Sequence, residues 1–230
     1  MSIITKLIWI FLFVGVVLLM SFLKDSRGKA RKVIFFGDSI TQAGAQFGGY
    51  ISFMKDMLAK QDIPDYDLVG AGIGGNKVYD LYLRMSEDVI AQSPDIVVIW
   101  IGVNDVWHKS TYGTGTDADK FEKFYRAIIK QLQAKNIKVM LVTPAVIGEK
   151  NDYSNQQDGD LNKYSQIIRN IAKDSDLPLC DLHSLFHLYE VNNNPANADK
   201  GILTIDGVHL NQTGNRFVAE EMWKVLKEVK

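Results

Sequence analysis

The sequence has a single cysteine, Cys180, among its 230 residues. A lone thiol cannot form an intramolecular disulfide, and its place in the apolar stretch LPLCDL predicts a packed side chain. Internal repeats and low-complexity tracts are also absent from the sequence. With 47% hydrophobic residues, a chain of this length is expected to form one globular domain.

The sequence has no excess of positive charge outside its first 32 residues. Residues 33–230 carry 20 basic and 26 acidic side chains, a net charge of −6, whereas residues 1–32 have a net charge of +5. Proteins that bind nucleic acid need a basic surface to face the phosphates. We therefore expect no nucleic-acid partner for residues 33–230.

The sequence has only one long hydrophobic run, Leu7–Leu23, which comprises 17 residues without a charge. As a helix it would be about 25 Å long, close to the bilayer core of about 30 Å. It predicts an N-terminal transmembrane anchor, followed by a basic linker up to residue 32 and by a domain over 33–230. A cleaved signal peptide is the alternative, but no small-residue cleavage site follows the run.

Continuous apolar runs alternate with amphipathic patterns after Lys32. The runs predict buried strands at Val33–Phe36, Leu68–Val69, Ile96–Ile101, Val139–Val142 and Leu177–Cys180. Apolar residues at three- and four-residue spacing predict helices at 50–60, 78–92, 119–135, 159–174 and 212–229. This alternation predicts a flavodoxin-like three-layer α/β/α fold with a five-stranded parallel sheet in the order 2-1-3-4-5.

Polar residues follow the ends of the predicted strands. Ser39 follows strand 1 in FFGDS, Asn104 follows strand 3 in IGVND, and Gly75 lies in GAGIGGN after strand 2. Asp206 and His209 lie in DGVHL, just before the last helix. Ligands of such folds bind at the carboxyl ends of strands 1 and 3, so one crevice is expected to collect these residues.

These residue types suit nucleophilic acyl transfer. His209 can take the proton of the Ser39 hydroxyl, and Asp206 can orient the imidazole. The backbone N–H groups of Ser39 and Gly75 and the side-chain amide of Asn104 can stabilise an oxyanion.

Four blocks of the sequence, FFGDSITQ, GAGIGGN, IGVND and DGVHL, resemble in order those of the SGNH (GDSL) hydrolases. The resemblance covers about residues 33–222. It implies a hydrolase of carboxylic esters, often short acyl or acetyl esters, that uses no metal or other cofactor. A G-x-S-x-G elbow is absent around Ser39, which argues against the α/β-hydrolase fold.

The resemblance also implies roles for individual residues. Ser39 would be the nucleophile, His209 and Asp206 its partners, and Gly75 and Asn104 members of the oxyanion hole. Two neighbouring glycines of the same block are alternatives to Gly75, which best matches the family position. We further expect the neighbours of Asn104, Trp107 and His108, to bind substrate, and the polar segments 106–118 and 146–160 to form loops at the rim of the pocket.

Other functions are compatible with parts of the pattern. Ser39 alone could cap a helix. Gly70, Gly72 and Gly75 match the dinucleotide fingerprint of NAD-binding domains, but they follow the second strand, and Gly102 stands where an acid should end the next one. A catalytically silent carbohydrate-binding module is a third possibility.

The spacing of His183 and His187, four residues apart, superficially suggests a metal site. An H-E-x-x-H pattern does not surround them, and the sequence shows no further cluster of ligands, so we expect no metal.

Two observations disagree on the orientation of the predicted anchor. Five basic residues and one acidic residue follow the run before residue 33, which by the positive-inside rule places the domain in the cytoplasm. Relatives with an N-terminal hydrophobic segment, however, often act outside the cytoplasm on envelope or glycan esters. We expect an extracytoplasmic domain, because the charge bias can be overridden when a large domain follows.

Overall fold

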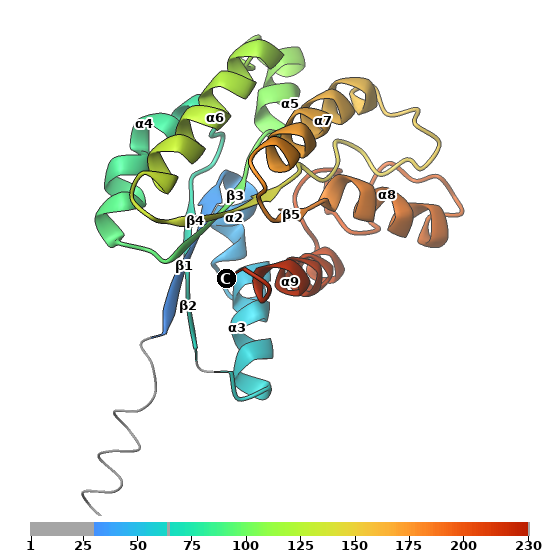
Figure 1. Cartoon of the computed structure of the whole chain (residues 1–230). Helices are drawn as coiled ribbons and strands as arrows, with labels where there is room; N and C mark the ends of the chain where they lie inside the picture. Colours follow the sequence, from blue (N-terminus) through green and yellow to red (C-terminus); the bar gives the residue numbers. More distant parts are fainter. Residues whose placement is uncertain (1–29, 64, 230) are drawn as a thin grey trace, which may run out of the picture. The chain divides into compact units, whose positions relative to one another are not determined.

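The strands form a five-stranded parallel sheet in the order β2-β1-β3-β4-β5, as predicted. Figure 1 shows a computed structural model that describes residues 30–63 and 65–229. The strands are β1 (Arg31–Gly37), β2 (Tyr66–Gly72), β3 (Ile96–Trp100), β4 (Lys138–Val142) and β5 (Leu179–Cys180). The switch in strand order lies between β1 and β3, which places the expected crevice at their carboxyl ends.

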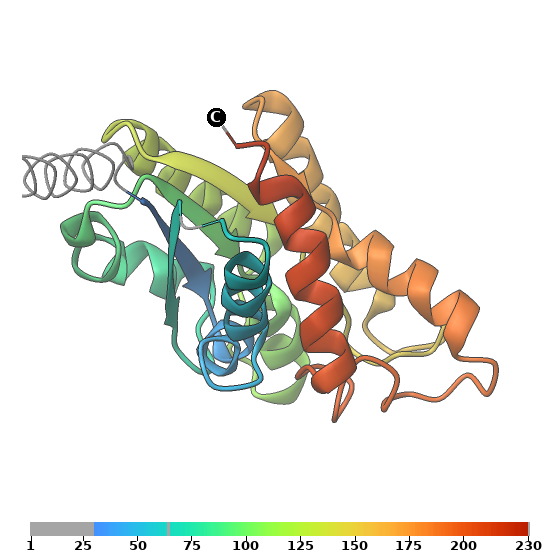
Figure 2. The same ribbon diagram turned by 90° about the horizontal axis from the view of Figure 1, so that it is seen from below.

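Helices cover both faces of the sheet (Figures 1 and 2). They are α2 (Ser39–Gly44), α3 (Tyr50–Lys60), α4 (Val78–Asp88), α5 (Val103–Thr111), α6 (Ala118–Gln133), α7 (Asp158–Asp174), α8 (Leu182–Asn193) and α9 (Gln212–Leu226), with a 3₁₀ turn η1 (Ile90–Gln92). One core packs the sheet against α3, α8 and α9, and the other packs it against α4, α6 and α7.

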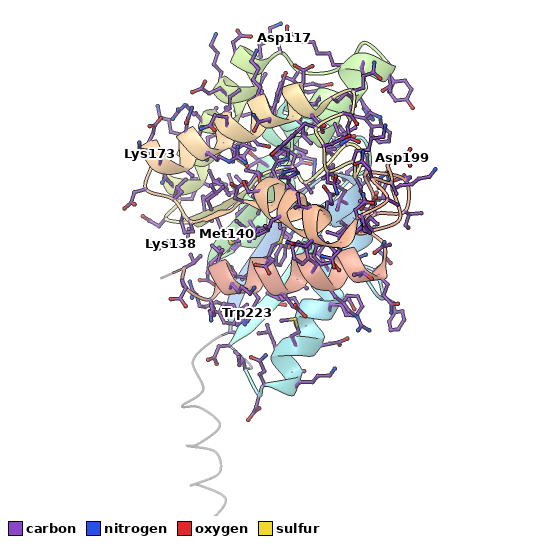
Figure 3. All side chains as sticks on the ribbon, turned by 90° about the vertical axis from the view of Figure 1, so that its right-hand side faces the viewer. Asp117, Lys138, Met140, Lys173, Asp199 and Trp223 are labelled. Atoms are coloured by element: carbon purple, nitrogen blue, oxygen red, sulfur yellow. The ribbon has the colours of Figure 1, made fainter. Side chains whose placement is uncertain are left out.

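Alternate residues of each strand enter opposite cores. In β1, Val33 and Phe35 join the core of α3 and α9, and Ile34 and Phe36 join the core of α4 and α6. All four side chains are buried. This explains why the strands are continuous apolar runs, since neither face of a doubly covered parallel sheet meets water. In Figure 3, Met140 of β4 lies between the helical layers, with Trp223 of α9 below it.

Three helices were not predicted. They are α2, α5 and α8, and α5 corrects the expectation that 106–118 is a loop, because residues 103–111 are helical. The sequence pattern misses α5 because its buried side chains include the polar Asn104 and Asp105. The predicted helix 78–92 ends at Asp88 and continues as the separate turn η1.

The predicted membrane anchor, residues 7–23, and most of the basic linker lie outside the described residues. The linker was expected to reach residue 32, but β1 already begins at Arg31, which pairs with Tyr66 of β2. Over residues 30–63 and 65–229, the structure has no helix of the length and apolarity that crossing a bilayer requires.

Candidate active site

Ser39 is the first residue of α2, directly after the turn that follows β1. The helix is capped by its neighbour Asp38, whose carboxylate accepts a hydrogen bond of 3.0 Å from the N–H of Ile40. The interpretation of Ser39 as the helix cap is therefore wrong. Gly37 permits the turn, since a Cβ there would lie 2.5 Å from both Thr41 Oγ1 and the Trp100 carbonyl oxygen.

Ser39, His209 and Asp206 form a continuous chain of hydrogen bonds. Ser39 Oγ lies 3.0 Å from His209 Nε2, and His209 Nδ1 lies 2.8 Å from Asp206 Oδ2. Because Nδ1–H donates its hydrogen bond to the Asp206 carboxylate, Nε2 carries no proton and can accept one from the serine hydroxyl. The structure thus brings Ser39 to a pair of residues, Asp206 and His209, although Ser39 and His209 are 170 positions apart in the sequence.

The loop that carries Asp206 and His209 is a tight turn. The second oxygen of Asp206 accepts from the N–H groups of Val208 and His209 at 3.0 and 2.8 Å, and the Ile205 N–H donates to the His209 carbonyl at 2.7 Å. Burial alone would raise the pKa of Asp206, but its hydrogen bonds from His209 and Val208 lower the pKa below its usual value. Asp206 is therefore held as an anion beside the imidazole.

The loop between β2 and α4 passes over Ser39. A Cβ built on Gly74 would lie 4.0 Å from Ser39 Cβ, and Gly75 adopts a φ of +75°, in the left-handed region that favours glycine. Asn104, in the first turn of α5, is 2% exposed and donates from Nδ2 to the Asn76 carbonyl at 3.1 Å. The loop therefore contacts Ser39 through Gly74 and Asn104 through Asn76, on either side of Gly75.

Two charged residues that the sequence analysis missed hold this loop in place. Arg84 of α4 donates to the carbonyl oxygens of Gly37 and Ala71, both at 2.9 Å, and to Asn76 Oδ1 at 2.7 Å. It thereby joins the ends of β1 and β2 to the loop. The only sequence signal would have been an arginine on a largely apolar helix, which is too common to identify it.

Asp105 is the second of these residues, and its side chain is fully buried. Its two oxygens accept from the Val78 N–H at 3.2 and 3.3 Å, which fastens the start of α4 to α5. Burial raises the pKa of Asp105 to about 7, and it does the same for Asp38. The sequence analysis did not assign Asp105 a role, although it directly follows Asn104.

Trp107 and His108 reach the site from α5. The Trp107 ring centre lies 6.3 Å from that of His209, and a Cβ on Gly75 would lie 3.8 Å from His108 Cε1. Burial, assisted by the charge of Lys77, lowers the pKa of His108. Both residues thus lie beside the proposed reacting groups, on a helix instead of the expected loop.

The remaining candidates lie elsewhere or are occupied structurally. Cys180 is buried, as predicted. His183 is on α8, where Nδ1 lies 2.8 Å from the Ala145 carbonyl oxygen, and the described residues include no group of three His, Cys, Asp or Glu side chains arranged for a metal. At Gly72 a Cβ would lie 2.1 Å from the backbone nitrogen of Gln42, so this glycine serves chain packing and leaves no room for a pyrophosphate.

Comparisons with known proteins agree with this architecture. The profile of the GDSL-like Lipase/Acylhydrolase family matches residues 35–217. The acetylxylan esterase of Geobacillus stearothermophilus is 30% identical over 212 residues, which cover 84% of this chain and 92% of that protein. A crystal structure of an acetyl xylan esterase, AlAXEase, is 63% identical with a TM-score of 0.83, and covers 84% of this chain and 98% of its own.

Two further similarities are to catalytic mutants of an esterase and to a lipoprotein. Structures of catalytic mutants of the Geobacillus esterase, 25–27% identical over 86% of this chain and 95% of theirs, have TM-scores of 0.75–0.76. These mutants replace a serine, an aspartate or a histidine by alanine, with the aspartate three positions before the histidine. The uncharacterized lipoprotein YqeF of Bacillus subtilis is 27% identical over 82% of this chain and 86% of its own.

The five-stranded parallel sheet with its flanking helices is that of the SGNH hydrolases. The chain belongs to the GDSL-like lipase/acylhydrolase family and is a carboxylic ester hydrolase. This assignment excludes the NAD-binding and the silent carbohydrate-binding interpretations.

Proposed function

We propose that this esterase removes acetyl groups from a glycan and that Ser39, His209 and Asp206 are its catalytic triad. The observation that carries the proposal is the hydrogen-bond chain from Ser39 Oγ through the His209 ring to Asp206. The acetylxylan esterases among its relatives support the substrate class. In the relative from Geobacillus, catalytic mutations fall on the same three residue types with the same Asp–His spacing.

The geometry gives each group a step in the reaction. His209 Nε2 takes the hydroxyl proton while Ser39 Oγ forms a bond to the acyl carbon. The negative charge passes to the carbonyl oxygen, which the N–H groups of Ser39 and Gly75 and the Asn104 amide stabilise. The C–O bond to the alcohol then breaks, and His209 gives its proton to the departing oxygen.

A water molecule completes the cycle. His209 removes a proton from the water as the water oxygen attacks the acyl-Ser39 ester, and it returns that proton to Ser39 Oγ as acetate leaves. Asp206 stays ionised throughout and stabilises the imidazolium in both halves of the cycle. Trp107 and His108 line the approach, which suits them to contact the alcohol part of the ester.

A replacement of the nucleophile tests the proposal. Ser39→Ala should abolish hydrolysis of p-nitrophenyl acetate and release of acetate from acetylated xylan, with an unchanged circular dichroism spectrum. Ser175→Ala is the matched control, because Ser175 is also half-buried but caps the end of α7. Full activity of the Ser39 variant would contradict the triad, and activity on p-nitrophenyl acetate without acetate release from xylan would contradict the substrate class.

We also propose that residues 7–23 anchor the enzyme in a membrane with the catalytic domain outside the cytoplasm. The uncharged run supports an anchor, and the lipoprotein relative supports the extracytoplasmic side. Protease added to intact spheroplasts should digest the domain. Protection until lysis would place the domain in the cytoplasm, as the charge rule predicts.

A further inference from the structure

A cavity of about 690 Å³ lies between α7, α8 and the segment 146–155. In Figure 3 the two helices face the viewer, with Lys173 near the end of α7 and Asp199 on the chain that follows α8. Neither Ser39, Asp206 nor His209 is among the described residues that line this cavity. It is therefore separate from the triad, and the hydrolytic mechanism leaves it without a role.

The two helices present polar faces to this cavity. On α8, His183, His187 and Glu190 follow at intervals of four and three residues, which places them on one face of the helix. On α7, Asn162 and Gln166 are four residues apart and line the opposite wall. A helix face of histidine, histidine and glutamate would be an unfavourable packing surface, but it suits the recognition of a polar ligand.

Glu190 is the most unusual residue of the wall. Its side chain is 2% exposed, and its Oε1 atom has no hydrogen-bond partner among the residues that the structure describes. Burial raises the pKa of Glu190 to about 8, helped by the charges of Glu149 and Asp158. A buried carboxyl group without a protein partner is rare, and its position on a cavity wall indicates that a ligand or water supplies the partner.

The charges around the cavity favour a neutral ligand. The guanidinium of Arg169 is paired with the Asp181 carboxylate at 2.9 Å and is therefore already compensated. Lys150 and Asp158 carry opposite charges on the wall. Burial lowers the pKa of His183, which keeps the ring neutral. The wall thus offers many hydrogen-bonding groups but little net charge for an ionic ligand.

An aromatic surface stands at one side of the cavity. The rings of Tyr153 and His187 are stacked with their centres 4.4 Å apart at an angle of 31°, and Tyr153 is 70% exposed. An exposed ring beside convergent polar groups matches a sugar, which has an apolar face of C–H groups and a rim of hydroxyls.

We propose that this cavity binds a neutral sugar unit of the glycan whose acetyl ester is cleaved at Ser39. The inference rests on the proposed function for the identity of the glycan. The cavity wall is joined to the loop that carries Asp206 and His209, because the Gly148 N–H donates to the Gly207 carbonyl at 2.9 Å. A bound sugar would therefore position the glycan relative to Ser39 and would also stabilise the 203–210 loop.

The test compares a small ester with an oligosaccharide. Tyr153→Ala should raise KM for acetylated xylotetraose at least tenfold and leave the hydrolysis of p-nitrophenyl acetate unchanged. Tyr153→Phe keeps the ring and should behave as wild type. Leu188→Ala is the matched control, because Leu188 is an exposed apolar side chain like that of Tyr153, but it lies on the part of α8 that does not line the cavity.

A binding measurement makes the test independent of turnover. Calorimetry with unacetylated xylotetraose should show binding to the Ser39→Ala protein, and Tyr153→Ala in that background should weaken it at least tenfold. Unchanged affinity and unchanged KM after Tyr153→Ala would overturn the sugar site. If Ser39→Ala instead kept full esterase activity while Tyr153→Ala still weakened xylotetraose binding, the triad would be wrong and the sugar site would stand.

Discussion

The two halves of the candidate active site are built differently. The serine side comprises Ser39, the loop 72–77 and Asn104, and buried groups fix it to the ends of the sheet. The histidine loop, residues 203–210, carries Asp206 and His209, whose side chains are 47% and 35% exposed. The structure therefore combines a buried half, which we propose stabilises the oxyanion, with a more exposed half, which we propose transfers the protons.

The histidine loop owes its position to a residue distant in sequence. Glu149 is fully buried, and its carboxylate accepts from the N–H groups of Ile202, Leu203 and Thr204 at 2.7, 2.6 and 2.7 Å. Three donors on one carboxylate hold the backbone that leads into the turn with Asp206 and His209. The single side chain of Glu149 thus fixes the position of the histidine loop, as the strand ends fix the position of the serine side.

The largest effect is expected for the replacement of His209, which should lower kcat without changing the stability of the fold. His209→Ala should lower kcat for p-nitrophenyl acetate by roughly 10³- to 10⁴-fold, because the base is lost. The melting temperature should stay within about 2 °C, since the His209 side chain is 35% exposed and its hydrogen bonds to Ser39 and Asp206 are not fully buried. His187→Ala is the control and should keep full activity on this small ester. Equal losses in the two variants would contradict the assignment of the base.

The anchor of the histidine loop is tested by two buried glutamates. Glu149→Gln places an amide donor against backbone donors and should lower the free energy of unfolding by about 3 kcal/mol. It should also reduce kcat, because the loop is no longer held. Glu190→Gln is the matched control, since that side chain is also buried but makes no hydrogen bond within the described part of the chain.

Chemical denaturation and steady-state kinetics measure both effects. The Glu190 variant should keep wild-type kcat on p-nitrophenyl acetate and be no less stable at pH 8. If Glu149→Gln and Glu190→Gln behaved alike, the three hydrogen bonds would not be what positions the loop.

The serine side should lose stability and activity together. Arg84→Ala removes one donor from the Gly37 carbonyl, which keeps the Ile73 N–H, and the arginine donors to the Ala71 carbonyl and the Asn76 side chain. It should cost roughly 2 to 3 kcal/mol of unfolding free energy. Because Asn76 holds Asn104, kcat should fall more than KM rises. Arg126→Ala removes only surface ion pairs and should cost less than about 1 kcal/mol. A stable Arg84 variant with normal kcat would show that the loop needs no such support.

The sequence predicts the parts of this molecule that follow simple periodicity. Strands β1, β3 and β4 were found because both of their faces are largely apolar. The helix starting at Tyr50 was found with both ends correct because one of its faces is buried. α8 was missed because its pattern is inverted: Leu188 and Val191 are exposed, while Glu190 is buried.

The site likewise contains residues that the sequence could predict and residues that it could not. Ser39 follows a strand end and Asp206 and His209 directly precede the last helix, all in short motifs, so their gathering at one crevice could be predicted from the sequence. Arg84 and Glu149 act through hydrogen bonds to the backbone, at separations of 47 residues for Gly37 and 53 for Ile202. Such contacts depend on where the backbone runs in space and leave no motif in the sequence.

The two halves should also differ in how pH changes their stability. The contribution of Asp105 falls as pH rises, whereas that of Asp206 falls as pH decreases. Burial raises the pKa of Asp105 on the serine side to about 7 from its ordinary 3.8. In that interval the folded protein keeps a proton that the unfolded chain releases, so stability falls as pH rises. Asp206 has a lowered pKa, so its contribution is complete above pH 3.8 and is lost only at lower pH.

Denaturation at pH 5 and at pH 7 therefore distinguishes the two aspartates. Wild type should lose stability between these values, and Asp105→Asn should lose on the order of 2 kcal/mol less, because the amide cannot ionise. Asp206→Asn should show the same difference between pH 5 and pH 7 as wild type, although its kcat is low. If Asp105→Asn kept the full wild-type fall, Asp105 would be ionised in the folded protein at pH 5. The Val78 N–H would then have to outweigh the burial of the carboxylate, and the serine side would share the electrostatics of the histidine loop.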